Sequence, residues 1–182
     1  MIIFDKITKT TLTLMLLGFA LWFGGSILRT AIGYDLFSPE AVLSLKSHYS
    51  PQVQMQNVYL FANLAIYTAI GYSVFFISML VLFFKNKSRL KQNGWLLMAF
   101  VLLLIASPVQ FYLMYFDYNL AMPVVRERLA DFQSYPVQNY FLNRFTNDNL
   151  TVLSSLSFLI TMTSAIYFIW MPLKKTIKAN EN

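Results

Sequence analysis

Four long runs of apolar residues, almost free of charge, follow one another along the chain. They extend over about 10–29, 58–84, 95–116 and 150–171. About 20 consecutive apolar residues are needed to cross the hydrocarbon core of a bilayer as a helix. The runs lack the alternation of apolar and polar residues that marks half-buried strands, and an open sheet would leave backbone groups unpaired in lipid. The pattern therefore predicts an all-α integral membrane protein, a bundle of four transmembrane helices.

Three loops connect the predicted spans. The link over 85–94 is short and basic, whereas the segments 30–57 and 117–149 are long and polar. In the longest segment, Pro123 and the stretch "SYPVQNYFLNRF" predict short interfacial helices with aromatic rings at the lipid headgroup level, where such rings are favoured. No linker divides the spans into two units, so we expect a single domain over 1–182.

Serine-proline pairs mark two expected helix starts in the first long loop. Serine caps the first turn of a helix, and proline suits its first position because that position has no hydrogen bond to lose. Ser38 with Pro39 predicts one such helix. Ser50 with Pro51 is followed by no breaker before Val58, so the second span is expected to begin near Pro51 and to project beyond the bilayer.

The composition supports the membrane assignment and excludes several kinds of redox and metal site. The chain is 57% hydrophobic and 12% charged, whereas about a quarter of the residues in a soluble domain are charged. The absence of cysteine excludes disulfide relays, iron–sulfur clusters and thiolate zinc sites. The single histidine, His48, excludes a haem held by two histidines of this chain and an HExxH centre. We therefore expect no cofactor and no intrinsic metal.

The net charge of +6 predicts orientation rather than nucleic-acid binding. Basic residues are enriched in cytoplasmic loops, and here they dominate the side that holds both termini and the short loop. On the opposite side, acidic residues offset the basic ones. The first run is longer than the apolar core of a signal peptide, about 7 to 15 residues, so it is interpreted as a retained span. We predict cytoplasmic termini, two outward loops and, as the default for a compact chain without sorting tails, a bacterial inner membrane. The basic residues of the predicted inner side are Lys6, Lys9, Lys85, Lys87, Arg89, Lys91, Lys174, Lys175 and Lys178.

Small and hydroxylated residues define one face on each of two spans. At about 100° per residue, the members of each set fall within about 80° of one another. Such faces allow membrane helices to approach closely and to form hydrogen bonds. The favoured interpretation is that the two faces pack together; the alternative is a polar conduit lined by the hydroxyl groups. The residues are Ala62, Ala65, Ala69 and Ser73 on the second span, and Ser154, Ser157, Thr161 and Ser164 on the fourth.

A polar cluster is predicted at the outer end of the bundle. Arg29 is the only basic residue joined directly to the outer end of a span, one turn beyond Gly25 on the same face. On the third span, Gln110 and Asp117 share a face beyond Pro108, which removes a backbone hydrogen bond and bends a helix. A cation at this depth takes a partner or extends to the headgroups. We hypothesise that Gln110 and Asp117 meet Arg29; extension without a partner is the alternative.

Boundary aromatics and the lack of catalytic motifs favour an interaction role. The number of aromatic residues at this boundary is larger than anchoring of four helices in the membrane requires, and aromatic residues are common at protein contacts. These residues are Tyr112, Tyr115, Phe116 and Tyr118. We expect them to contact a partner or lipid. The sequence thus predicts a non-catalytic tetraspan subunit or accessory protein of a larger membrane complex. Its expected partners are membrane lipids and other integral membrane proteins or further copies of itself, and no nucleic acid.

Two other classes of function stay open. Ion-driven transport places a carboxylate or a broken helix near the bilayer midplane, and no predicted span has Asp or Glu at its centre. A channel or transporter component, including one that handles lipid, is the main alternative. An enzyme at the outer face needs a nucleophile, acid, base or metal in convergent positions, and the outer acidic residues with His48 form no catalytic motif. We recognise no family in the sequence.

Overall fold

Four helices of the protein, described here from a computed structural model, are long and apolar enough to cross a membrane. The described residues are 6–38, 44–87, 90, 94–129 and 131–170. The candidate spans extend over Ile7–Tyr34, Pro51–Asn86, Gly94–Arg126 and Asp148–Phe168. Many large apolar side chains are exposed around all four helices, as expected of surface that meets lipid. The predicted bundle of four apolar helices is confirmed, and its four candidate spans are typical of an integral membrane protein.

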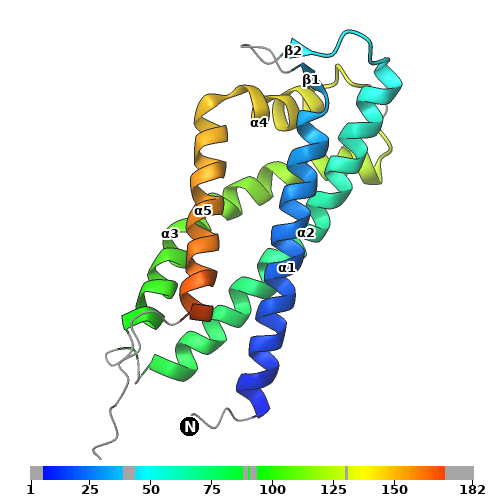
Figure 1. Cartoon of the computed structure of the whole chain (residues 1–182). Helices are drawn as coiled ribbons and strands as arrows, with labels where there is room; N and C mark the ends of the chain where they lie inside the picture. Colours follow the sequence, from blue (N-terminus) through cyan, green and yellow to red (C-terminus); the bar gives the residue numbers. More distant parts are fainter. Residues whose placement is uncertain (1–5, 39–43, 88–89, 91–93, 130, 171–182) are drawn as a thin grey trace, which may run out of the picture.

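Five α-helices and several short elements make up the described part of the chain. The long helices are α1 (Lys6–Tyr34), α2 (Pro51–Asn86), α3 (Gly94–Ala121) and α5 (Asp148–Trp170). The short elements are β1 (Phe37–Ser38), β2 (Ser44–Leu45), the π-helical turns η2 (Met122–Arg126) and η3 (Val137–Leu142), and α4 (Asn143–Thr146). They gather at one end of the bundle, which we call the loop end (Figure 1). There β1 and β2 pair antiparallel, with Phe37 opposite Leu45.

The helix boundaries follow local signals at some ends and depart from them at others. α2 begins as predicted, because Pro51 is its first residue and the Ser50 hydroxyl accepts a hydrogen bond from the Val53 amide at 3.4 Å. Ser38 lies in β1, and the helix predicted to start at Pro39 falls outside the described residues. The predicted end of the fourth span at residue 171 and the lysines of the tail also lie outside them.

α3 is longer than the sequence predicts and passes through its proline. Pro108 has no N–H to offer the carbonyl of Leu104, and the Ser107 hydroxyl donates to that carbonyl instead, at 3.1 Å. Side-chain hydroxyls are known to satisfy freed carbonyls in this way within membranes. Pro123 does not open a separate interfacial helix, because it lies in η2, which follows α3 directly.

The bundle consists of two helix pairs, α1 with α2 and α3 with α5, joined by contacts between α2 and α3. In Figure 1, α5 stands apart from α1, and α3 crosses behind them toward α2 at the loop end. Two glycines bring α1 and α2 into backbone contact. A Cβ atom at Gly18 would lie 2.6 Å from the backbone nitrogen of Phe75, and one at Gly71 would lie 2.6 Å from that of Trp22.

The hydroxyl face of α5 packs on α3, so the predicted contact with the alanine face of α2 is wrong. Ser157 Oγ donates to the carbonyl of Ala106 at 3.2 Å, and Ser164 Oγ donates to that of Ala99 at 2.7 Å. The small alanines let the serines reach the backbone of α3. Thr161 is fully buried on the same face and its hydroxyl has no hydrogen-bond partner among the described residues.

The alanine face of α2 is turned toward α3 and the loop end. Ala62 and Ala65 are buried, and Ala62 belongs to the hydrophobic cluster of the loop end. Ala65 and Ala69 line an apolar hollow of about 250 Å³ together with residues of α3. Ser73 Oγ donates to the carbonyl of Ala69 within its own helix. Periodicity identified these faces, but not the helix that covers each one.

Candidate functional site

A polar layer separates two hydrophobic clusters inside the bundle. The cluster away from the loop end includes, from α1, α2 and α3, Trp22, Tyr72 and Leu103. The cluster at the loop end includes Ala62 of α2, Leu120 of α3 and Leu36, which lies in the turn after α1. The turns between them carry the buried polar residues Arg29, Thr68, Gln110 and Asp117. Their position on three helices brings together groups that are far apart in the sequence.

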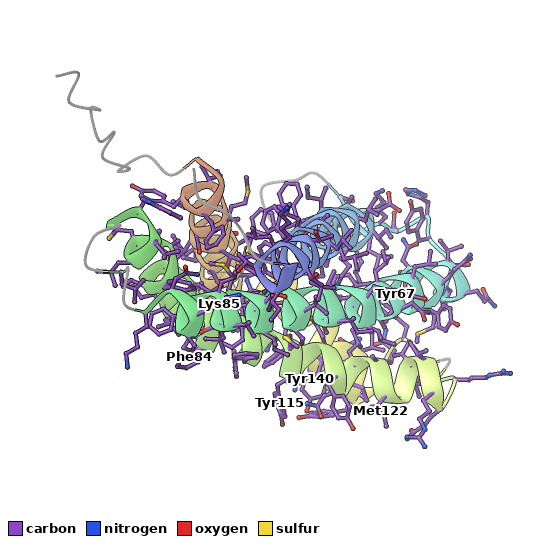
Figure 2. All side chains as sticks on the ribbon, turned by 90° about the horizontal axis from the view of Figure 1, so that it is seen from below. Tyr67, Phe84, Lys85, Tyr115, Met122 and Tyr140 are labelled. Atoms are coloured by element: carbon purple, nitrogen blue, oxygen red, sulfur yellow. The ribbon has the colours of Figure 1, made fainter. Side chains whose placement is uncertain are left out.

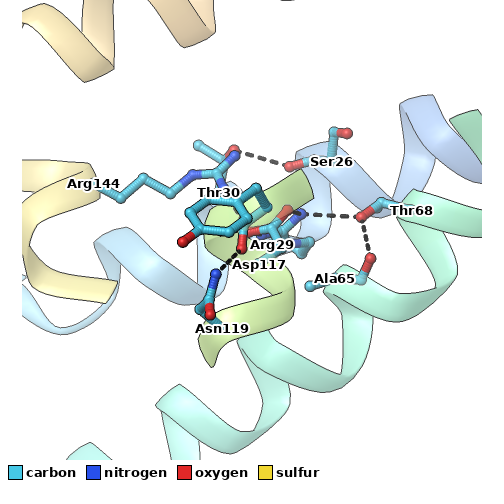
Figure 3. A network of polar contacts seen from close by, with 9 residues as sticks. Ser26, Arg29, Thr30, Ala65, Thr68, Asp117, Asn119 and Arg144 are labelled. Carbon is cyan, nitrogen blue, oxygen red and sulfur yellow. Dashed lines mark hydrogen bonds and ion pairs between the residues drawn. The ribbon is translucent and has the colours of Figure 1, made fainter. Parts of the chain in front are cut away.

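Arg29 of α1 and Asp117 of α3 form a two-point ion pair (Figure 3). Arg29 Nη1 donates to Asp117 Oδ2 at 2.9 Å, and Nη2 donates to Oδ1 at 2.5 Å. The residues are only 5% and 6% exposed, respectively. The planar guanidinium group matches both oxygens of a carboxylate in this arrangement. Arg29 therefore takes a buried partner in place of extending to the headgroups.

α2 supplies the remaining contacts of Arg29. Nη1 also donates to Thr68 Oγ1 at 3.0 Å, and that hydroxyl donates to the carbonyl of Ala65 at 2.9 Å (Figure 3). The guanidinium carbon lies 4.3 Å from the ring centroid of Phe61, close enough for cation–π attraction. Gly25 makes room for Thr68, whose Cγ2 would lie 2.5 Å from a Cβ atom there. Arg29 Nε is buried without a hydrogen-bond partner among the described residues.

Arg144 of α4 reaches the same carboxylate from the loop end. Its Nη1 donates to Asp117 Oδ1 at 2.5 Å, and its guanidinium carbon lies 5.8 Å from the ring centroid of Phe61. The Arg144 side chain keeps 15% of its surface exposed, against 6% for Arg29. Burial lowers the pKa of Arg144 to about 10, against the opposing effect of Asp117. The guanidinium group therefore stays protonated at neutral pH.

Gln110 belongs to the polar layer but is not bonded to Arg29, which corrects one part of the predicted cluster. Its side-chain amide donates to Ser157 Oγ on α5 at 2.9 Å. Gln110 is 7% exposed. The hydrogen bond to Ser157 therefore satisfies an amide that is buried away from water. The third span thus turns Asp117 toward α1 and Gln110 toward α5.

A pocket of about 380 Å³ opens beside the polar layer, between α1 and α5. Arg29, Arg144 and Gln110 are part of its lining, and so is Ser154, which was predicted to serve helix packing. The exposed residues of the two helices that line it are Ile27, Thr30 and Tyr34 of α1 with Ser155 and Leu159 of α5, which we call the rim. Because this rim lies on two candidate spans, the pocket opens sideways from the bundle.

The polar groups at this pocket carry a surplus positive charge. Among the described residues that line it and the small adjoining cavity of about 30 Å³, the charged side chains are Arg29, Arg144 and Asp117. One carboxylate thus faces two guanidinium groups. An unbalanced charge away from water costs several kcal/mol, as an order of magnitude, so this arrangement favours an anion close by.

Sequence reasoning missed Arg144, Thr68 and Phe61. Arg144 counted only as one charge of the long second loop, although it precedes the predicted fourth span by six residues and is the basic residue nearest to that end. This proximity was the available signal. Thr68 and Phe61 gave none, because a threonine and a phenylalanine in an apolar run are ordinary, and their role follows only from the position of Arg29.

The boundary aromatics divide into exposed and buried residues. Tyr112, Tyr115 and Tyr118 are 49%, 57% and 61% exposed. Phe116 is 8% exposed and packs edge-on against Tyr140, with 5.5 Å between the ring centroids. Figure 2 shows Tyr115 and Tyr140 near each other on the outside of the bundle. Phe116 is therefore a core residue, which corrects its prediction as a partner contact.

Asp35 ties the end of α1 to the first loop and to α2. Its carboxylate accepts hydrogen bonds from Lys46 Nζ at 3.0 Å, from the Tyr49 hydroxyl at 3.0 Å and from the Asn57 amide at 3.2 Å. Lys46 Nζ also lies 4.9 Å from the ring centroid of Tyr49. These bonds hold the pKa of Asp35 below its ordinary value of 3.8, with the Lys46 bond the largest cause.

No protein-family model, curated protein or solved structure matches this chain. In the described part of the chain, no group of three or more His, Asp or Glu side chains is arranged to hold a metal ion. The polar layer with its side pocket is thus the candidate site on geometry alone.

Proposed function

We propose that this protein binds an acidic amphiphile in the membrane, with the anionic head at Arg144, beside the pair of Arg29 and Asp117, and the apolar tail leaving the pocket between α1 and α5. One observation carries the proposal: two arginines share a single buried carboxylate at a pocket of about 380 Å³ that opens sideways. A guanidinium group binds carboxylate and phosphate oxygens with charge-assisted hydrogen bonds. A lipid tail suits the rim, because Ile27 and Leu159 are apolar and exposed.

The depth of the site supports the same function. Arg29 lies five residues before the end of α1 at Tyr34, which is about 7 Å at 1.5 Å per residue. An amphiphile in a bilayer keeps its head near this boundary and its tail toward the midplane. We further propose, from the excess of basic residues at the termini and the 85–94 loop, that the loop end faces outward. The bound molecule would then belong to the outer leaflet of a bacterial inner membrane.

Retention of lipid during purification tests the proposal. The protein is extracted from membranes in mild detergent, and its bound lipid is identified by native mass spectrometry and lipid extraction. We expect acidic amphiphiles to be enriched over their share of the membrane, at a fixed stoichiometry. Loss of one charge-assisted contact of about 1.5–3 kcal/mol corresponds to at least a tenfold loss of affinity, so Arg144→Gln should retain much less.

Arg126→Gln is the matched control. Arg126 is an exposed arginine of η2 at the loop end and does not line the pocket, so this variant makes the same change in net charge. Equal retention by Arg144→Gln and Arg126→Gln would show that the acidic lipid binds the surface nonspecifically. Enrichment of zwitterionic lipid alone in the parent protein would overturn the proposal outright.

A subunit or accessory role is the second candidate, and exposed aromatics favour it. Tyr112, Tyr115 and Tyr118 project from α3 near the loop end, and Tyr135 beyond it is 70% exposed. Aromatic side chains are enriched at protein contacts. The same mild-detergent preparation, analysed for protein companions, tests this candidate. A stoichiometric companion that is lost in a Tyr115→Ala and Tyr118→Ala double variant supports it, and recovery of a lone monomer contradicts it.

A further inference from the structure

The charge balance of the polar layer limits the charge of the molecule that fits there. This inference rests on the proposed function and concerns the chemical class of its ligand. Around the pocket and the adjoining cavity, the described charged groups are two guanidinium groups and one carboxylate. The other polar lining groups, including Ser26, Thr30 and Gln110, are neutral. The surplus is therefore a single positive charge.

Asp117 is fully engaged, whereas Arg144 has donors to spare. Asp117 Oδ1 accepts from Arg29 Nη2 and Arg144 Nη1, and Oδ2 accepts from Arg29 Nη1. Arg144 uses one of its nitrogens on this carboxylate, lines the pocket and stays partly exposed. Arg29 uses both terminal nitrogens on Asp117 and Thr68. Arg144 is thus the group that is free to hold a ligand, while Asp117 keeps Arg29 neutralised.

We infer that the pocket selects amphiphiles whose head carries one negative charge, and that Asp117 sets this selectivity by holding the surplus at a single positive charge. The shared chemistry is an oxyanion that accepts from a guanidinium group, found in a phosphodiester headgroup and in a fatty-acid carboxylate. A phosphomonoester carries close to two charges above its second pKa of about 6, which leaves one negative charge unbalanced. A zwitterionic head adds a cation beside Arg144.

Competition among defined amphiphiles tests the inference. The purified protein is exchanged into micelles that contain equal amounts of phosphatidylglycerol, oleate, phosphatidate and phosphatidylcholine at pH 8.5, and bound species are counted by native mass spectrometry. We expect phosphatidylglycerol or oleate to exceed phosphatidate and phosphatidylcholine at least fivefold. The ratio of phosphatidylglycerol to oleate distinguishes a phosphodiester ligand from a carboxylate one.

Charge substitutions then move the preference in opposite directions. Asp117→Asn raises the surplus to two charges and should shift the ratio toward phosphatidate at least tenfold. Arg144→Gln removes the surplus and should abolish the preference for acidic over zwitterionic heads. The double variant Asp117→Asn with Arg144→Gln restores one surplus charge, held by Arg29, and should regain the preference for single charges. Asp117→Glu keeps the charge and serves as the control.

Different results would overturn lipid binding and the selectivity assigned to Asp117. If the parent protein binds none of the acidic amphiphiles, the proposed function falls. If it binds them and Asp117→Asn ranks them as the parent does, the function stands and the assignment of selectivity to Asp117 is wrong. Should Asp117→Asn fail to fold, Arg144→Gln and the double variant carry the test. An unchanged ranking in the folded variants overturns the inference.

Discussion

The guanidinium group of Arg29 and the carboxylate of Asp117 join two helices that belong to different pairs of the bundle. Arg29 lies on α1, which packs against α2, and Asp117 lies on α3, which packs against α5. A pocket lies between α1 and α5 at this level, and the two helices also meet where Phe158 of α5 packs against the rings of Trp22 and Phe23 of α1. The ion pair is therefore a principal contact between the two helix pairs at the polar layer.

Removing Arg29 should destabilise the protein. Loss of one partner of a buried ion pair costs about 3–5 kcal/mol, because the remaining charge is left unbalanced. Arg144 still neutralises Asp117 in Arg29→Gln, so we expect the lower end of that range and a clear fall in melting temperature in detergent. Arg126→Gln, at an exposed position, should melt like the parent protein. Equal melting of both variants would mean that the ion pair does not hold the two helix pairs together.

Alanine substitutions at Gly18 and Gly24 of α1 should have different effects on the stability of the protein. A Cβ atom at Gly18 would lie 2.8 Å from the carbonyl oxygen of Gly71, whereas one at Gly24 would meet nothing within 4 Å. Gly18→Ala should therefore force α1 and α2 apart and lower the melting temperature. Gly24→Ala should be neutral or stabilising by up to about 1 kcal/mol, because alanine favours a helix over glycine. A stable Gly18→Ala variant would contradict the observed backbone contact.

The spans were predictable from the sequence because the need to satisfy every backbone group in lipid leaves helices as the solution for long apolar runs. The start of α2 was predictable for a local reason, the serine and proline at Ser50 and Pro51. The partners of the small-residue faces were not. A period of 3.6 residues places Ser157 and Ser164 on one side of a helix, but the neighbour that covers them is decided by contacts elsewhere in the bundle.

The candidate site shows the same limit. Arg29 and Asp117 could be named together because each is a charged residue at the same end of a span. Arg144 lies 27 residues beyond Asp117, and only the path of the second loop brings it back to the carboxylate. Gln110 shares a helix face with Asp117 in projection, yet seven residues at 1.5 Å per residue separate them by about 10 Å along the axis, where Gln110 meets Ser157 of α5.

The hydrogen bond between Gln110 and Ser157 should stabilise the contact of α3 with α5 by a small amount. Hydrogen bonds between membrane helices contribute about 0.6 kcal/mol on average, and up to about 2 kcal/mol. Gln110→Leu and Ser157→Ala should each lower stability, and the double variant should lose less than the sum of both. A double-mutant cycle of unfolding in detergent measures the coupling. Ser73→Ala is the control, because Ser73 bonds only within its own helix, and additive losses at Gln110 and Ser157 would contradict a direct bond.

Acid should release the first loop through Asp35. Its folded-state pKa lies below 3.8, mainly because Lys46 and Tyr49 donate hydrogen bonds to the ionised form. A lowered carboxyl pKa stabilises the fold above the unfolded pKa of 3.8, and this contribution is lost as the pH falls through the lower folded value. Hydrogen exchange of 44–50, corrected for intrinsic rates, should therefore be constant from pH 7 to about 5, rise as the pH falls from about 3.8 to the folded pKa, and level off below it. Asp35→Asn should show the faster exchange already at pH 7, whereas Glu127→Gln, an exposed neutralisation at the same end, should not.

Exchange in Asp35→Asn equal to that of the parent would contradict this prediction. It would mean that the backbone bonds of the loop hold it without the carboxylate, such as the bond from Lys46 N–H to the carbonyl of Leu36 at 3.0 Å.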